Sequence, residues 1–123
     1  MKSYQKYGLF FLVFILVLIF YVSSLQFSGG VSSSLMSVGY HFGIFFLFGG
    51  FVFLLFIDRK ISSREIFICL LFCFLYACLD ELHQYFVPLR SATLSDVFVD
   101  SFGIVCSLIF VRFVSERKQK KGI

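Results

Sequence analysis

Four long apolar runs constrain this chain more than any other feature. They lie at about residues 7–27, 38–57, 66–85 and 93–114, and each approaches the roughly 20 residues that a helix needs to cross a bilayer. A helix satisfies all of its backbone N–H and C=O groups within one segment, as the bilayer core requires. The runs therefore predict an all-α, polytopic membrane protein, a bundle of four transmembrane helices in a single membrane domain that spans residues 1–123.

Composition supports this class. The 123 residues are 59% hydrophobic and only 15% charged, whereas a soluble domain is roughly half apolar and about a quarter charged. Twenty phenylalanines supply apolar area without a polar group to satisfy, which suits lipid-facing helices. The net charge of +4 comes from short basic tracts beside the apolar runs, so membrane topology explains it and no nucleic-acid partner is expected. The four cysteines lie inside the apolar runs, so we predict packing residues and no disulfide.

The first apolar run has a competing interpretation as a signal peptide. Lys2 and Lys6 would form the basic region that precedes the apolar stretch, and small residues follow it. The run is at the long end for such a segment, and no A-x-A-like cleavage site follows. We therefore favour a retained helix.

The distribution of Lys and Arg predicts the orientation of the helices. Two such residues precede the first run, three lie in the loop at 58–65, and five lie from Arg112 to the C-terminus, whereas the two remaining loops hold none and one, Arg90. Cytoplasmic loops carry the excess of Lys and Arg. We therefore expect a multi-pass protein of the cell membrane with both termini cytoplasmic, and a frayed, basic cytoplasmic tail at 115–123.

The stretch between residues 79 and 100 carries most of the unusual chemistry. Polar groups in so apolar a chain are costly to place and mark functional sites. With the predicted topology, they lie at the outer membrane face together with His41, which begins the second helix. The stretch contains the following polar residues: Asp80, Glu81, His83, Gln84, Arg90, Asp96 and Asp100.

The carboxylates have a spacing that groups them on helix faces. Asp96 and Asp100 are one turn apart. Asp96 falls in a first helical turn, where an anion is favoured, so a simple helix-start role is an equal alternative. Asp100 lies about 6 Å deeper and needs a partner, for which Arg90 or His41 is the obvious candidate. Its role is then functional or part of a polar network.

The end of the third run carries a second group. Asp80 and Gln84 are also one turn apart, and Glu81 lies about 100° round the helix. Ordinary solvated charges at a helix end would account for Glu81 or His83 taken singly. They account less well for Asp80, which directly follows the apolar residues 77–79.

Arg90 can clamp a phosphate or carboxylate with its bidentate fork. Its alternative role is an internal salt bridge to one of the nearby acids.

His41 can act as a general base, a metal ligand or a hydrogen-bonded bundle residue. A divalent-metal site made by His41, His83, Asp80 and Asp96 has no fixed ligand spacing to support it. The sequence thus predicts no metal and no cofactor.

These residues form a pattern that resembles the VanZ-like family. Residues 80–90 match D-E-x-x-Q-x-F-x-P-x-R, residues 96–103 match the D-x-x-x-[ND]-x-x-G start of the last helix, and Ser23–Ser24 and His41 stand where the family has them. The chain departs from the family at three places. Ile44 and Phe45 replace a frequent Glu and Tyr, no lysine precedes His41, and Leu89 replaces the usual glycine.

The resemblance implies a small multi-spanning membrane protein of the cell envelope, in a family whose founding member is associated with low-level resistance to teicoplanin. Our first hypothesis is that the protein binds or acts on an anionic lipid-linked or glycopeptide-like envelope component at the outer face. Membrane lipid and an envelope precursor or glycopeptide are its expected partners. The ligand-binding candidates are Arg90, Gln84, Asp80, Asp96 and Asp100.

Two alternatives come from other classes of protein. A membrane-embedded enzyme would use Asp80 or Glu81 with Asp96 or Asp100 as an acid/base pair, assisted by His41. No nucleophile or cofactor motif supports a particular reaction. A purely structural protein would use the polar network to lock a bundle that serves as a partner subunit. The sequence predicts no oligomeric state.

Overall fold

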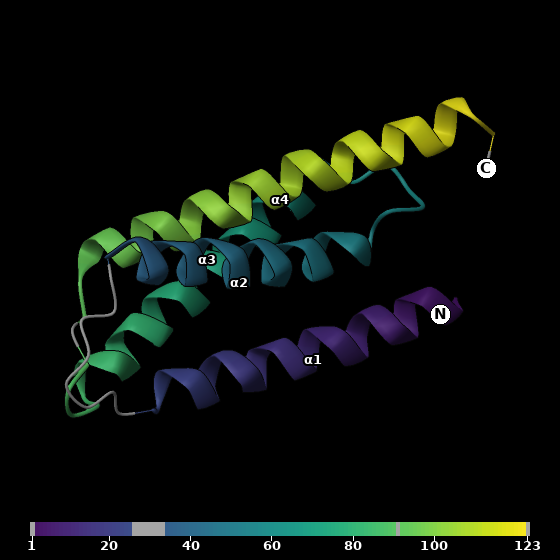
Figure 1. The fold of residues 1–123 in the computed structure, drawn as a ribbon. Coiled ribbons are helices and arrows are strands. Elements are labelled where there is room, and N and C mark those ends of the chain that lie inside the picture. Colours follow the sequence, from purple (N-terminus) through teal and green to yellow (C-terminus); the bar gives the residue numbers. More distant parts are fainter. Residues whose placement is uncertain (1, 26–33, 91, 123) are drawn as a thin grey trace.

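The computed structural model describes residues 2–25, 34–90 and 92–122. Their fold consists of helices and loops, with no strand in these ranges (Figure 1). Each helix is long and apolar enough to cross a bilayer. The prediction of an all-α protein with four potential spans is therefore confirmed. The helices are α1 (Ser3–Ser23), α2 (Ser34–Leu54), α3 (Ser63–Tyr85) and α4 (Leu94–Lys120).

The helices pack into a bundle whose most extensive contact joins α2 and α4 (Figure 1). Helix α1 packs on α2 and α3, and α4 also packs on α3. Both termini and the α2–α3 loop lie at one end, where the ammonium groups of Lys2 and Lys118 lie 3.0 Å and 3.7 Å from the Asp58 carboxylate. We call this the basic end. The opposite end, where α1 and α3 finish and α2 and α4 begin, is called the polar end.

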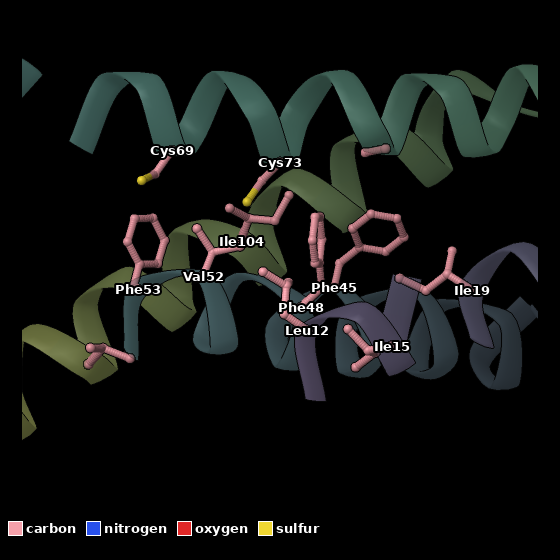
Figure 2. Close-up of a cluster of buried hydrophobic side chains, with 12 residues drawn as sticks. Leu12, Ile15, Ile19, Phe45, Phe48, Val52, Phe53, Cys69, Cys73 and Ile104 are labelled. Carbon is pink, nitrogen blue, oxygen red and sulfur yellow. The ribbon is translucent and has the colours of Figure 1, made fainter. Parts of the chain in front are cut away.

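The core between the helices is apolar. Figure 2 shows Leu12, Ile15 and Ile19 of α1 facing Phe45 and Phe48 of α2, with the thiols of α3 beside them. Many other large apolar side chains, including most of the phenylalanines, are exposed on the outside of the bundle. That distribution fits helices surrounded by lipid, because a bilayer places no penalty on outward apolar groups. Cys69 and Cys73 are buried free thiols that pack in this core, as their position predicted.

Local capping explains why α3 begins earlier than residue 66, where we expected it to start. The backbone N–H of Glu65 donates to Ser62 Oγ at 3.3 Å, and Glu65 Oε2 accepts from the Ser62 N–H at 2.9 Å. This reciprocal pair is a capping box, which satisfies two otherwise unpaired donors at a helix start. The helix ends at Tyr85, as the position of Pro88 predicted.

The expectation of a frayed tail after residue 114 was wrong. Helix α4 continues to Lys120. The hydroxyl of Ser115 donates to the carbonyl oxygen of Ile57 at 2.9 Å, and Lys118 pairs with Asp58. These contacts tie the last turns of α4 to the α2–α3 loop, and cations near a helix C-terminus also favour the helix.

Two glycines allow α2 and α4 to approach each other closely. A Cβ atom on Gly103 would lie 2.6 Å from the carbonyl oxygen of Phe42 and 3.1 Å from the amide nitrogen of Phe46. A Cβ atom on Gly49 would meet the Cα of Ile104 at 3.2 Å. Gly39 and Gly43, one turn apart and typical of helix contacts, have no described atom within 4 Å of such a position.

Candidate functional site

Six polar side chains are buried together at the polar end of the bundle. They come from all four helix regions, since Ser23 ends α1, His41 lies near the start of α2, and the others belong to α3 and α4. Each is no more than 7% exposed. We call these residues the polar cluster: Ser23, His41, Asp80, Glu81, Gln84 and Asp100.

Asp80 is held between α1 and α3. The hydroxyl of Ser23 donates to Asp80 Oδ1, and the side-chain amide of Gln84 donates to Asp80 Oδ2 at 3.2 Å. The same Gln84 nitrogen lies 3.3 Å from Ser23 Oγ. Both carboxylate oxygens of Asp80 are therefore satisfied, and the one-turn spacing of Asp80 and Gln84 places them on one helix face as expected.

His41 and Asp100 join α2 to α4. His41 Nδ1 lies 2.8 Å from Asp100 Oδ1, and both side chains are almost fully buried. His41 was one of the two partners expected for Asp100. On the other side of the imidazole ring, Nε2 lies 3.8 Å from Asp96 Oδ2, whose carboxylate is 16% exposed. One histidine thus lies between two carboxylates of the same helix face.

Glu81 is anchored to the start of α4. The backbone N–H of Thr93 donates to Glu81 Oε1 at 2.7 Å. Within the described residues, Glu81 Oε2 and Asp100 Oδ2 are buried without a hydrogen-bond partner, and so is the Tyr40 hydroxyl. Buried polar atoms of this kind are uncommon in folded proteins and mark places where an ion, a water or a ligand belongs.

His83 lies beside the polar cluster and not in it. Its Nε2 is 2.8 Å from the hydroxyl of Ser24, and its ring stacks on Phe20 with centroids 4.6 Å apart. His83 therefore tethers the end of α3 to α1. The metal-ligand set weighed from the sequence, which joined His83 to His41, Asp80 and Asp96, is not assembled.

Arg90 follows α3 in the connection to α4 and is half-buried. Its charge is close enough to act on Asp80 and Tyr40. The residue before it, Leu89, has φ = 66°, in the left-handed region that glycine adopts without strain. A glycine, which the family resemblance implies at this position, would adopt this geometry without strain.

Two members of this site were not among the predicted binding or catalytic residues. Ser23 was matched, together with Ser24, to the family pattern without a binding or catalytic role; it is fully buried and bonded to Asp80. The sequence feature that points to Ser23 is a serine at the end of an apolar run, on the side of the membrane where the other polar residues were predicted. Tyr40 directly precedes His41, and its phenol gives the site a hydroxyl group. The contribution of Thr93 is a backbone N–H, which no sequence pattern identifies.

The geometry permits two kinds of chemistry. The hydrogen-bonded His41 and Asp100 form a pair that can hold and transfer a proton. His41, Glu81 and Asp100 also each offer a ligand atom, and these atoms lie within 4.8 Å of one another. The site therefore joins titratable groups from α2, α3 and α4 at one end of a multi-pass bundle.

The four apolar helices and this buried polar end define a multi-pass membrane protein. Comparison with family profiles adds a match to the one described as VanZ/LLP1 over residues 7–115. The match covers most of the chain, so the protein belongs to the VanZ/LLP1 family. No curated protein and no solved structure matches it.

Proposed function

We propose that this VanZ-family protein binds an anionic component of the cell envelope, either lipid-linked or glycopeptide-like, at the outer face of the membrane. Arg90 would bind the anionic group through its bidentate guanidinium. Gln84, Asp80, Asp96 and Asp100 would shape the polar part of the site. A contribution to teicoplanin resistance would follow from binding of this kind.

The observation that carries the proposal is the polar cluster itself, six buried polar side chains at one end of an otherwise apolar bundle. Helices in lipid can associate through packing without buried ionisable groups, as the apolar core of this bundle illustrates. Ionisable groups at such depth are expensive, and their usual roles are ligand binding, ion binding or proton transfer. Arg90 places a positive charge beside the cluster, which favours an anionic ligand.

We also propose that the polar end faces outwards and that both termini are cytoplasmic. The support is the concentration of Lys and Arg at the opposite end. Fusions of green fluorescent protein and of alkaline phosphatase to the C-terminus test the orientation. The proposal expects fluorescence with inactive phosphatase. Active phosphatase with no fluorescence would place the polar end in the cytoplasm and overturn an outer-face site.

The ligand is tested by native mass spectrometry of the purified protein with a defined panel: phosphatidylglycerol, phosphatidylethanolamine, a polyprenyl phosphate and teicoplanin. We expect an anionic member of the panel to be retained. Arg90→Lys should weaken retention by about ten-fold, because a point charge replaces a bidentate fork. Arg112→Gln, which removes a cation at the basic end, serves as the control and should retain the ligand.

Two results would contradict the proposal. One is the absence of selective retention in the wild-type protein. The other is an equal loss in Arg90→Lys and Arg112→Gln, which would indicate unspecific attraction of anions to a basic protein. Because Arg112 lines an open cavity at the basic end, the pair of variants also decides at which end the ligand sits.

A second candidate function, a membrane-embedded enzyme, is favoured by the 2.8 Å contact between His41 and Asp100. With Asp96 beside the ring, this pair has the parts of an acid/base centre. Incubation with the retained ligand, followed by mass analysis of that ligand, tests the idea. A changed ligand mass that persists in the control Asp58→Asn but is lost in Asp96→Asn supports an enzyme. An unchanged ligand in the wild-type protein excludes turnover of that ligand.

A further inference from the structure

We infer that the polar cluster contains a binding site for one divalent transition-metal cation, held by a ring nitrogen of His41 and one carboxylate oxygen each from Glu81 and Asp100. These three ligand atoms come from three helices, α2, α3 and α4, and lie within 4.8 Å of one another. All three side chains are buried, at 3%, 7% and 0% exposure.

The two carboxylates are anchored in the same way. Each has one oxygen engaged, Glu81 Oε1 by the N–H of Thr93 at 2.7 Å and Asp100 Oδ1 by His41 Nδ1 at 2.8 Å. Each leaves its second oxygen buried and, among the described residues, without a partner. The Thr93 N–H is an outer hydrogen bond of the kind that commonly orients a metal ligand, whereas the His41–Asp100 contact joins two of the proposed ligands. An unsatisfied buried acceptor on each acid is what a cation between them would use.

The ligand types indicate which cations fit. Mixed imidazole and carboxylate ligation suits Zn²⁺ and Mn²⁺, whereas Mg²⁺ and Ca²⁺ prefer oxygen ligands alone. Ligand atoms around a tetrahedral zinc lie about 3.4 Å apart, given bonds of about 2.1 Å. The three atoms would therefore close by only a small side-chain adjustment. Asp96, with Oδ2 3.8 Å from His41 Nε2, lies where a fourth ligand, its carboxylate oxygen, can enter.

The charge of the polar end gives an independent reason. Four carboxylates, those of Asp80, Glu81, Asp96 and Asp100, lie near one histidine and one arginine. Buried anions without compensation are strongly unfavourable. A bound dication would offset two of these charges. The bound cation would also add positive charge beside Arg90, where the anionic ligand is proposed to bind. This last point rests on the proposed function, whereas the metal site itself is independent of it.

Binding of Mn²⁺ alone to the purified full-length protein tests the inference without any lipid. Electron paramagnetic resonance of free Mn²⁺ measures the bound fraction during titration, and Zn²⁺ is added as a competitor. We expect one saturable site per chain, displaced by Zn²⁺ and not by equal Mg²⁺. Glu81→Gln and Asp100→Asn should each weaken binding by about ten-fold or more.

Asp58→Asn is the control, because it removes one carboxylate charge at the basic end, where Asp58 pairs with Lys2 and Lys118. It should bind Mn²⁺ like the wild-type protein. Absence of a saturable site in the wild type overturns the inference. An equal loss in Asp58→Asn and the two ligand variants also overturns it, since the effect would then be one of general charge.

A measurement that leaves the cluster intact covers the case in which the ligand variants fail to fold. Electron spin-echo spectroscopy of bound Mn²⁺ detects an imidazole nitrogen in the coordination sphere. The chain has two histidines, and His83 lies outside the cluster. The nitrogen signal should therefore persist in His83→Gln. A signal that is absent from the wild type, or lost in His83→Gln, contradicts a site built on His41.

Discussion

The two ends of the bundle use similar charged residues in opposite ways. At the basic end, the Lys2 and Arg59 side chains are 70% and 55% exposed, and they pair with Asp58 and Glu65 in the presence of water. At the polar end, His41 and Asp100 pair with side-chain exposures of 4% and 0%. Exposed ion pairs contribute little to stability, whereas breaking a buried pair is strongly destabilising.

The charged residues of the basic end are proposed to set the orientation of the protein in the membrane, whereas those of the polar end form the proposed binding site. Charges at the basic end can be solvated whichever residues carry them, so their number matters for topology more than their positions. Charges at the polar end depend on individual partners, because each buried atom needs a hydrogen bond or an ion. Substitutions should therefore have large, position-specific effects at the polar end and small ones at the basic end.

The largest effect is expected for Gly103→Ala, which tests the close packing that brings the two halves of the polar cluster together. The new Cβ would meet the backbone of Phe42 and Phe46, so α2 and α4 must move apart. Overpacking of this kind costs about 1–3 kcal/mol. Melting in detergent measures the loss, with Gly43→Ala as control because its Cβ meets no described atom within 4 Å. Equal melting of the two variants would contradict the close approach of the helices.

Ser23→Ala sharpens the contrast between buried and exposed hydrogen bonds. The variant leaves an oxygen of buried Asp80 without its donor, which costs about 1–3 kcal/mol. The neighbouring Ser24 is exposed, so Ser24→Ala should lower the melting temperature less. A larger loss for Ser24→Ala than for Ser23→Ala would show that burial does not decide the effect.

Leu89→Gly tests whether the connection before Arg90 is strained. A non-glycine residue in the left-handed region loses about 1–2 kcal/mol, and the greater freedom of glycine in the unfolded chain offsets about 0.5–1 kcal/mol. We expect a small rise in melting temperature and unchanged ligand retention. Leu82→Gly, in the helical part of α3, is the control and should melt lower. A lower melting temperature for Leu89→Gly would contradict the strain.

The smallest effect is expected for Asp58→Asn at the basic end. The Lys2 and Lys118 ammonium groups hold the pKa of Asp58 below its ordinary value of 3.8. A lowered pKa in the folded state means that the pairs stabilise the fold above 3.8, and that this contribution is lost as the pH falls through the folded-state pKa. Melting of the variant should thus differ slightly from wild type at pH 7 and converge with it in acid. A difference that grows in acid would have the wrong sign.

The sequence was sufficient to predict the helices because membrane spans are encoded by length and apolarity alone. Their ends were less accurate. The start of α3 at Ser63 depends on the Ser62–Glu65 capping box, and the extension of α4 depends on the contacts of Ser115 and Lys118 with the α2–α3 loop. The first was readable as a local motif, whereas the second depends on tertiary contacts that no local pattern reveals.

The candidate site was partly predictable for a related reason. Residues on one helix, such as Asp80 with Gln84, have a spacing that fixes their common face. Topology brought His41 to the same end as Asp100. The pairing of Ser23 with Asp80 and the unpartnered oxygens of Glu81 and Asp100 depend on how α1, α3 and α4 are rotated about their axes. No periodicity encodes that rotation in uniformly apolar helices.

The most direct test of the proposed binding site is the melting of Asp100→Asn and wild type in detergent, with and without the panel of envelope ligands. We expect an anionic ligand to raise the melting temperature of the wild type, and we expect Asp100→Asn to lose this rise while remaining folded. An undiminished rise in the variant would contradict a binding role for Asp100. A melting temperature lowered by the same amount with every ligand and with none would show that the polar cluster is a structural support.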